Sequence, residues 1–192
     1  MKFNKYFFVF IVILVTIPLI GCSKQVLLNE SNSNLLNYNF KITNLKNIDK
    51  TLSNQKYGYS TDPNRKYAAV IIYQGKKASM NQYLVNKSDI VNLNIPKDSF
   101  FIISLHANCT IASSWNIKNN IDNGIIQFQN RSWIDIPMPK SEKGKPGLNY
   151  NRQNFYFKTL KLGSQKIIMR YEHEVEEIDE PFEINFNIKI NE

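Results

Sequence analysis

Residues 182–190 read FEINFNIKI, and apolar and polar side chains alternate along the whole stretch. A period of two residues places all five apolar side chains on one face of an extended strand, whereas a helix would distribute them around its axis. Similar short runs recur through the second half of the chain, separated by turns rich in Gly, Pro and Asn. No segment has a convincing helical period with capping residues. We therefore expect an all-β protein.

Short strands at regular spacing are typical of an antiparallel β-sandwich of about 100 residues. Residues 87–192 supply one such domain. Residues 38–86 form a β-rich extension, which is either a separate subdomain or a set of extra strands in the same sandwich. The sequence KLGS at 161–164 predicts a tight hairpin turn with glycine at a position of positive φ. The expected strands are 38–43, 67–73, 91–95, 100–105, 113–117, 124–129, 132–136, 152–160, 165–172 and 182–190.

The N-terminal sequence MKFNKYFFVFIVILVTIPLIGC is typical of a bacterial lipoprotein. Two lysines precede a continuous apolar run, which ends in small residues before Cys22. We expect residues 1–21 to be a signal peptide and 22–37 a tether, lipidated at Cys22 by diacylglycerol and a further acyl chain such as palmitate. The alternative, an uncleaved membrane helix, needs about 20 apolar residues, and this run is shorter. The expected location is the extracytoplasmic face of a bacterial cell membrane.

The chain is basic, with 24 Lys and Arg against 16 Asp and Glu. The lysines are scattered among asparagines and form no basic stripe, so a nucleic-acid partner is not expected. Anionic envelope polymers or lipid headgroups are plainer partners for an anchored protein. If Cys22 carries lipid, Cys109 has no partner within the chain, and the core alone must hold the fold.

The stretch LHANCTIASSW, residues 105–115, resembles the first binding loop of the chagasin family, the Ig-like inhibitors of papain-type cysteine peptidases. That family has a strand of the form V-x-V-x-x-G-x-x-F-x-I-x-L followed by N-P-T-T-G-Y-x-W. Here VNLNIPKDSFFIISL precedes the loop, and Asn108, Thr110 and Trp115 match in identity and spacing. Ala112 is a near match to the glycine. Cys109, Ile111 and Ser113 replace the proline, the second threonine and the aromatic residue.

The resemblance continues downstream over about half of the chain. Residues 155–157 and 160–163 match the family's F-x-F-x-A-x-x-x-G strand in rhythm, and 167–171 its next strand. The resemblance implies three loops that form a wedge for the cleft of a cysteine peptidase, without catalysis, metal or cofactor. A Gly-rich second loop falls at Gly147, Leu148, Asn149 and Tyr150, with fewer glycines than the pattern. The R-P-W position of the third loop falls at His173, Glu174 and Val175 and does not match.

Three other interpretations remain open. Cys109 and His173 could form a nucleophilic dyad, oriented by Glu172 or Glu174. His106, Cys109 and His173 could bind a metal, although no two of them form a sequence-local ligand pair. The same sandwich could serve a surface lipoprotein as an adhesion or envelope-binding module without inhibitory activity.

The aromatic residues of alternating strands are expected in the core: Trp115, Trp133, Phe155 and Phe157.

Overall fold

The computed structural model describes residues 33–41, 45–53, 65–110, 112–137, 140, 143–144, 146–147, 149–173 and 181–192. The expected signal peptide, the lipidation at Cys22 and the first part of the tether lie outside the described residues. So do Ile111, Leu148, Glu174 and Val175 of the expected loops.

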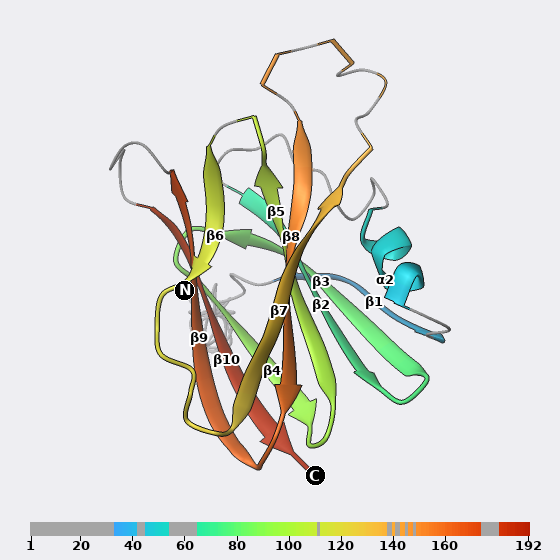
Figure 1. Ribbon diagram of the computed structural model, residues 1–192, viewed down its shortest axis with the longest axis vertical. Coiled ribbons are helices and arrows are strands. Elements are labelled where there is room, and N and C mark those ends of the chain that lie inside the picture. The colour runs from blue at the N-terminus through green and yellow to red at the C-terminus, as the bar shows by residue number, and fades with distance from the viewer. Residues whose placement is uncertain are drawn as a thin grey trace, which may run out of the picture.

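The described chain forms two β-sheets that face each other (Figure 1). Strands β1, β3, β2, β5, β8 and β7 form a six-stranded sheet in that order, and β4, β10, β9 and β6 form a four-stranded sheet. The predicted all-β sandwich is therefore confirmed. The strands are β1 (Ser33–Lys41), β2 (Arg65–Gln74), β3 (Lys77–Asn86), β4 (Asp89–Pro96), β5 (Phe100–Asn108), β6 (Ser113–Ile117), β7 (Ile126–Asp135), β8 (Tyr150–Thr159), β9 (Gly163–His173) and β10 (Phe182–Asn191).

One strand pair is parallel, whereas we expected an antiparallel sandwich throughout. Strand β4 pairs with β10 in a parallel register, with Val91 opposite Phe186. The chain leaves β4 for β5 in the other sheet and reaches β10 only at its end, so no hairpin forces these two strands to run in opposite directions.

The main core lies between the two sheets and follows the alternation seen in the sequence. In β10 the side chains of Ile184, Phe186, Ile188 and Ile190 are buried, while Asn187 and Lys189 are exposed. The inward side chains of the other sheet include Val70, Phe101, Ile103, Leu105, Phe155 and Phe157.

The expected extension belongs to the same sandwich. Strand β2 pairs with the central strand β5, with Ala68 opposite Leu105, and its inward side chains join the main core. Strand β3, which the sequence did not predict, pairs with β2 through a turn at Gly75, where φ is +59°. Strand β1 begins at Ser33, so residues 33–37, expected in the tether, pair with β3 instead.

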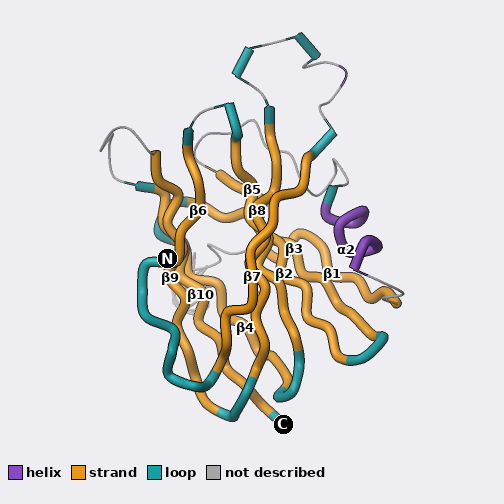
Figure 2. The backbone as a smooth tube through the Cα atoms, viewed as in Figure 1, coloured by secondary structure: helices purple, strands orange, loops and turns teal. Residues whose placement is uncertain are grey.

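A short helix, α2 (Leu45–Leu52), covers part of the outer face of the six-stranded sheet (Figure 2). Its sequence, LKNIDKTL, lies within residues 38–86, where we expected a β-rich extension and no helix. Ile48 and Leu52, one helical turn apart, are fully buried. They pack in a second apolar cluster with Ala69, Ile71, Ala78, Met80 and Ile102.

The connection at 161–164 is not a hairpin, because β8 and β9 belong to different sheets. The chain crosses from one sheet to the other here, and Gly163 has a φ of +143°. A Cβ atom on Gly163 would lie 2.9 Å from Cδ1 of Ile125. The glycine therefore satisfies both the backbone conformation and the close approach of a neighbouring loop.

The two predicted strands at 124–129 and 132–136 are one strand, β7. A bulge between Phe128 and Asn130 shifts its register against β8. The extra residue interrupts the alternation, which is why the sequence pattern divides at this point.

Candidate functional site at one end of the sandwich

The described residues of the predicted loops gather at one end of the sandwich, the upper end in Figure 1. Strand pairing brings them there: Asn108 at the end of β5 lies opposite Tyr150 at the start of β8, and Ser113 at the start of β6 lies opposite His173 at the end of β9. The structure therefore places described residues of all three expected loops at the same end.

Asn108 joins the first loop to its surroundings. Its backbone N–H donates to the hydroxyl oxygen of Tyr171 on β9, at 3.0 Å. Its side-chain amide donates to the carbonyl oxygen of Gly147 in the second loop, at 2.9 Å. Its side-chain oxygen accepts hydrogen bonds from the backbone N–H of Thr110, at 3.0 Å, and from the Thr110 hydroxyl. One asparagine thus holds its own turn, the second loop and β9 in a fixed relation.

Cys109 is also tied to the second loop. Its backbone N–H and its thiol both donate to the carbonyl oxygen of Asn149, each at 2.9 Å. Burial, and in addition the negative charge of Asp135, raise the pKa of the Cys109 thiol, although a backbone hydrogen bond lowers it. An activated nucleophile needs a pKa shift in the opposite direction. This environment therefore disfavours the Cys109–His173 dyad.

The base of the first loop is anchored in the core by Trp115. This side chain is fully buried, and its indole N–H donates to the backbone carbonyl oxygen of His106, at 2.9 Å. Its ring packs against those of Tyr171 and Phe182, with centroids 5.2 and 5.9 Å apart. The loop therefore starts and ends on backbone that the core holds rigidly.

His106 points away from this loop, because side chains alternate along β5. Its ring lies against that of Tyr150, with centroids 4.7 Å apart, and burial lowers the pKa of His106 to about 3. Cys109, in contrast, is exposed. Within the described part of the chain, no group of three or more His, Cys, Asp or Glu residues is placed to bind a metal.

The exposed tip of the site consists of small and polar residues. Cys109, Thr110 and Ala112 are exposed in the first loop, Gly147 and Asn149 in the second, and His173 at the end of β9. Ser113 is 8% exposed and lies at the base of the loop. The tip can therefore bring its backbone close to another surface.

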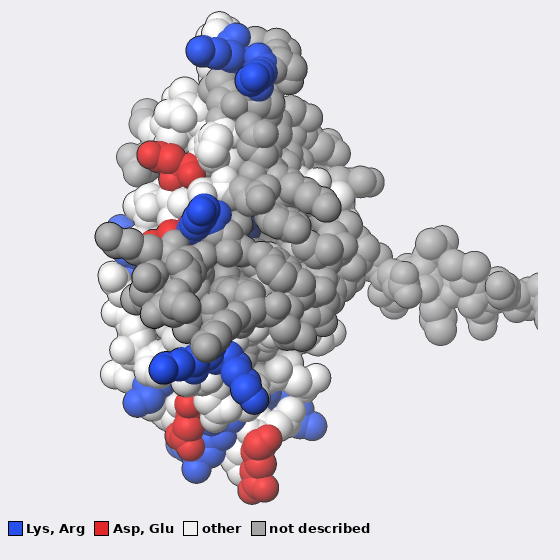
Figure 3. All heavy atoms as spheres, turned by 90° about the vertical axis from the view of Figure 1, so that its right-hand side faces the viewer, with Lys and Arg blue, Asp and Glu red and all other residues white. Residues whose placement is uncertain are grey.

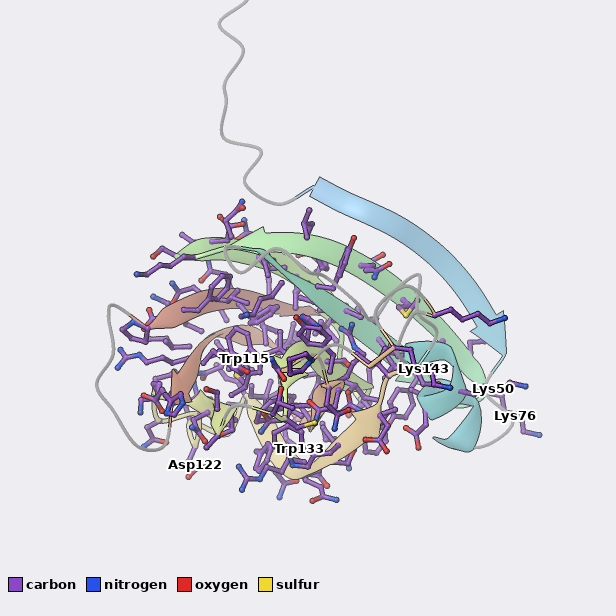
Figure 4. The ribbon with its side chains drawn as sticks, turned by 90° about the horizontal axis from the view of Figure 1, so that it is seen from above. Lys50, Lys76, Trp115, Asp122, Trp133 and Lys143 are labelled. Carbon is purple, nitrogen blue, oxygen red and sulfur yellow. The ribbon has the colours of Figure 1, made fainter. Side chains whose placement is uncertain are left out.

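The aromatic residues divide into two groups. Trp115, Phe155 and Phe157 are buried, as predicted, whereas Trp133 is 46% exposed, so its predicted core position is wrong. Figure 4 shows Trp115 within the sandwich and Trp133 on the edge strand β7. β7 lies at the edge of its sheet, and no further described strand covers it there.

Sequence reasoning missed Tyr171, which connects β9 to the first loop. Its alternating position resembles that of any core aromatic residue. The signal that could have identified it is chemical, since a buried tyrosine hydroxyl needs a hydrogen-bond partner. The Lys66 ammonium lies 4.7 Å from the centroid of the Tyr171 ring and makes a cation–π contact with it.

Charged side chains of both signs lie on the face of the molecule that Figure 3 shows. On the face seen in Figure 3, Lys and Arg side chains lie near Asp and Glu side chains. Among the described residues, no helix has the length and apolar character needed to cross a bilayer.

No family model matches the sequence, and no curated protein matches it. One similar solved structure is the cysteine protease inhibitor EhICP2 from Entamoeba histolytica, with 20% identity over 55% of this chain and 88% of that chain, and a TM-score of 0.42. Another is the solution structure of amebosin, with 12% identity over 54% of this chain and 98% of that chain, and a TM-score of 0.38. At these values the likeness carries no argument about function.

Proposed function

We propose that this protein inhibits papain-like cysteine peptidases by inserting its loop end into the active-site cleft. It does so from the extracytoplasmic face of a bacterial membrane, anchored through lipid on Cys22. The observation that carries the proposal is the hydrogen-bond network of Asn108, which ties a chagasin-like loop to the second loop and to β9.

The network matters because rigid loops lose little conformational entropy on binding. A loop held by Gly147, Tyr171 and its own turn already has the shape that it needs in the complex. Thr110 and Ala112 at the tip are small enough to enter a narrow cleft. The raised pKa of Cys109 fits this role, because a neutral thiol near the peptidase's own cysteine would not compete as a nucleophile.

The direct test is a titration of the full chain, purified in detergent, against papain or a cathepsin. We expect nanomolar inhibition that is reversible and competitive with a peptide substrate. Full residual activity at micromolar protein would contradict the proposal and would favour the binding-module function.

Variants at the tip locate the contact. Replacing Thr110 by Arg and Ala112 by Tyr places bulky side chains where the wedge must enter, and we expect at least about 30-fold weaker inhibition. Unchanged inhibition by this double variant would place the contact elsewhere on the protein.

A matched pair of asparagines separates the loop geometry from general stability. Asn119, beyond the other end of β6, also bridges a loop to β9, through Lys166 and Ile168. We expect Asn108→Ala and Asn119→Ala to lower stability to a similar extent, and only Asn108→Ala to weaken inhibition. Equal loss of inhibition in both would show that the network contributes only to folding.

Anchoring has its own test. Cells expressing the protein and fed an alkynyl fatty acid should label it, and Cys22→Ser should abolish the label and release the protein from the membrane fraction. Labelling that survives this substitution would contradict lipidation at Cys22.

A further inference from the structure

The outer edge of β7 presents unpaired backbone groups. β7 pairs with β8 on one side, and no described strand lies on its other side. The Ile136 N–H donates to the Tyr150 carbonyl oxygen, at 3.3 Å, so even-numbered residues of this half of β7 face β8. In an antiparallel ladder the alternate residues then direct their N–H and C=O groups to the free edge. Those residues are Arg131, Trp133 and Asp135.

The side chains of these three residues also share one face of the strand, because successive side chains alternate. Trp133 is 46% exposed, and both Arg131 and Asp135 are exposed. Neither Arg131 nor Asp135 forms an ion pair with a residue in the described part of the chain. The edge therefore displays a cation, an aromatic ring and an anion at equal spacing, and neither charge has an ion-pair partner among the described residues.

The segment from Arg131 to Asp135 has complementary charges when it pairs in antiparallel orientation with a second copy of itself. An antiparallel strand centred opposite Trp133 places Arg131 of one copy opposite Asp135 of the other, and the two-fold axis repeats that pair. It also places Trp133 opposite Trp133, and aromatic and opposite-charge pairs both stabilise adjacent strands. The Trp133 N–H and C=O groups of the two copies then meet as a hydrogen-bonded pair, and each Asp135 N–H meets the Arg131 carbonyl oxygen of the other copy, whereas the Arg131 N–H stays bonded to the Asn130 side chain.

We propose that a second copy of this chain is the partner of the β7 edge, and that the two copies form a two-fold dimer through antiparallel β7–β7 pairing centred on Trp133. This association goes beyond the proposed inhibition and does not depend on it.

The local structure limits the pairing to a short segment. On the N-terminal side of the segment, the bulge at Phe128 and Asn130 breaks the register, and the Asn130 side chain already accepts the Arg131 N–H, at 2.8 Å. On the C-terminal side, Pro137 has no N–H to donate. Pairing over about five residues a side gives a small interface of the kind that supports weak, reversible association.

The antiparallel arrangement also sets the orientation of the two copies. Because β7 of one copy runs against β7 of the other, their loop ends point in opposite directions. Each loop end stays accessible, and a dimer can engage two targets at once.

Charge reversal tests the register. The full chain in density-matched detergent is followed by sedimentation velocity over a range of concentrations, for wild type, Arg131→Asp, Asp135→Arg and the double variant. We expect dimerisation of the wild type to weaken about tenfold or more in each single variant, because like charges then face each other twice. The double variant restores opposite charges in the same register and should dimerise like the wild type.

Tryptophan fluorescence gives an independent readout. The chain has two tryptophans, and Trp115 is buried in the core. A shift of emission with concentration should therefore report Trp133, and Trp133→Phe should abolish it. Lys76→Asp, in the exposed β2–β3 turn, is the control for a change of net charge and should leave the dimer intact.

Two results would overturn the proposal. One is a wild type that stays monomeric at its highest soluble concentration. The other is a dimer that the single variants leave unchanged, or that the double variant fails to restore, because either outcome excludes this register.

Discussion

The outer face of β5 and β8 holds an unusual group of buried polar side chains. Arg152 is fully buried and donates to the Ser104 hydroxyl, at 2.7 Å, and to the Ser104 carbonyl oxygen, at 2.6 Å. His106 lies opposite Arg152 in the strand register and is 2% exposed. Burial first, and then the positive charges of Arg152 and Lys66, lower the pKa of His106 to about 3. The folded protein therefore keeps this imidazole neutral.

The depressed pKa predicts a loss of stability in mild acid. An unfolded histidine takes up a proton as the pH falls below its ordinary value of 6.5, whereas the folded His106 stays neutral until about pH 3. The stabilisation is therefore complete above pH 6.5 and declines below it, by up to about 1.4 kcal/mol per pH unit. Urea unfolding at several pH values between 7 and 4 measures the slope.

The control for this prediction is His106→Phe, which keeps a ring beside Tyr150 and removes the titrating group. Carboxylates also titrate in this range, so the difference between the two proteins is the informative quantity. Parallel slopes for wild type and variant would contradict the prediction.

At the scale of elements, one side chain joins the two sheets across the core. Gln153 on β8 is fully buried, accepts the backbone N–H of Trp115, at 2.7 Å, and donates to its carbonyl oxygen, at 3.0 Å. β6 lies at the edge of its own sheet, and the Gln153 amide makes the two backbone hydrogen bonds that a neighbouring strand would otherwise make there. The position of β6, and of the loop that precedes it, depends on this contact.

Replacing Gln153 by Leu should therefore be costly, although the core is apolar around it. The substitution leaves the N–H and C=O groups of Trp115 buried and unsatisfied, and we expect a loss of about 3 kcal/mol of unfolding free energy. Chemical denaturation measures it. Gln127→Leu on the exposed side of β7 is the matched control and should change stability by less than about 0.5 kcal/mol. A similar small effect at both sites would show that the sheets do not depend on this contact.

Sequence reasoning missed α2 and β3 for two different reasons. α2 is only two turns long, and among its side chains that the structure describes Ile48 and Leu52 are buried, so its period is too brief to detect. In β3 the buried residues lie on both faces of the sheet. Tyr83 belongs to the main core between the sheets, and Met80 belongs to the second apolar cluster on the outer face. Burial on both faces removes the simple alternation that identifies a half-buried strand.

At the scale of the whole molecule, we expect the described strands to unfold as one cooperative unit. β2 continues the six-stranded sheet beside β5 and contributes Ala68 and Val70 to the same core as β10. A separate subdomain would have its own core and few contacts with its neighbour.

Hydrogen exchange tests this unity. We expect amides in the β2–β5 ladder to exchange with the same opening free energy as those in the β5–β8 ladder, since both open only when the sandwich unfolds. Amides of the exposed turn at Gly75 and Lys76 serve as the rapidly exchanging reference. A lower opening free energy for β2 and β3 than for β8 would show that residues 65–86 unfold independently.

The candidate site could be predicted only in part. The resemblance to the chagasin family predicted the first loop through Asn108, Thr110 and Trp115, and the structure brings described residues of the other two predicted loops to the same end. Tyr171, Gly147 and Asn149 hold the first loop through hydrogen bonds between residues far apart in the chain. No local pattern reports such contacts.

The sequence by itself determined the fold class, most strand positions and the buried face of β10, because a period of two residues is a local property of an extended backbone. Only the tertiary structure decided that β8 and β9 lie in different sheets, that β4 runs parallel to β10, and that Trp133 lies at an open edge. Strand order depends on long-range pairing, and the alternation of side chains is the same whichever neighbour a strand acquires.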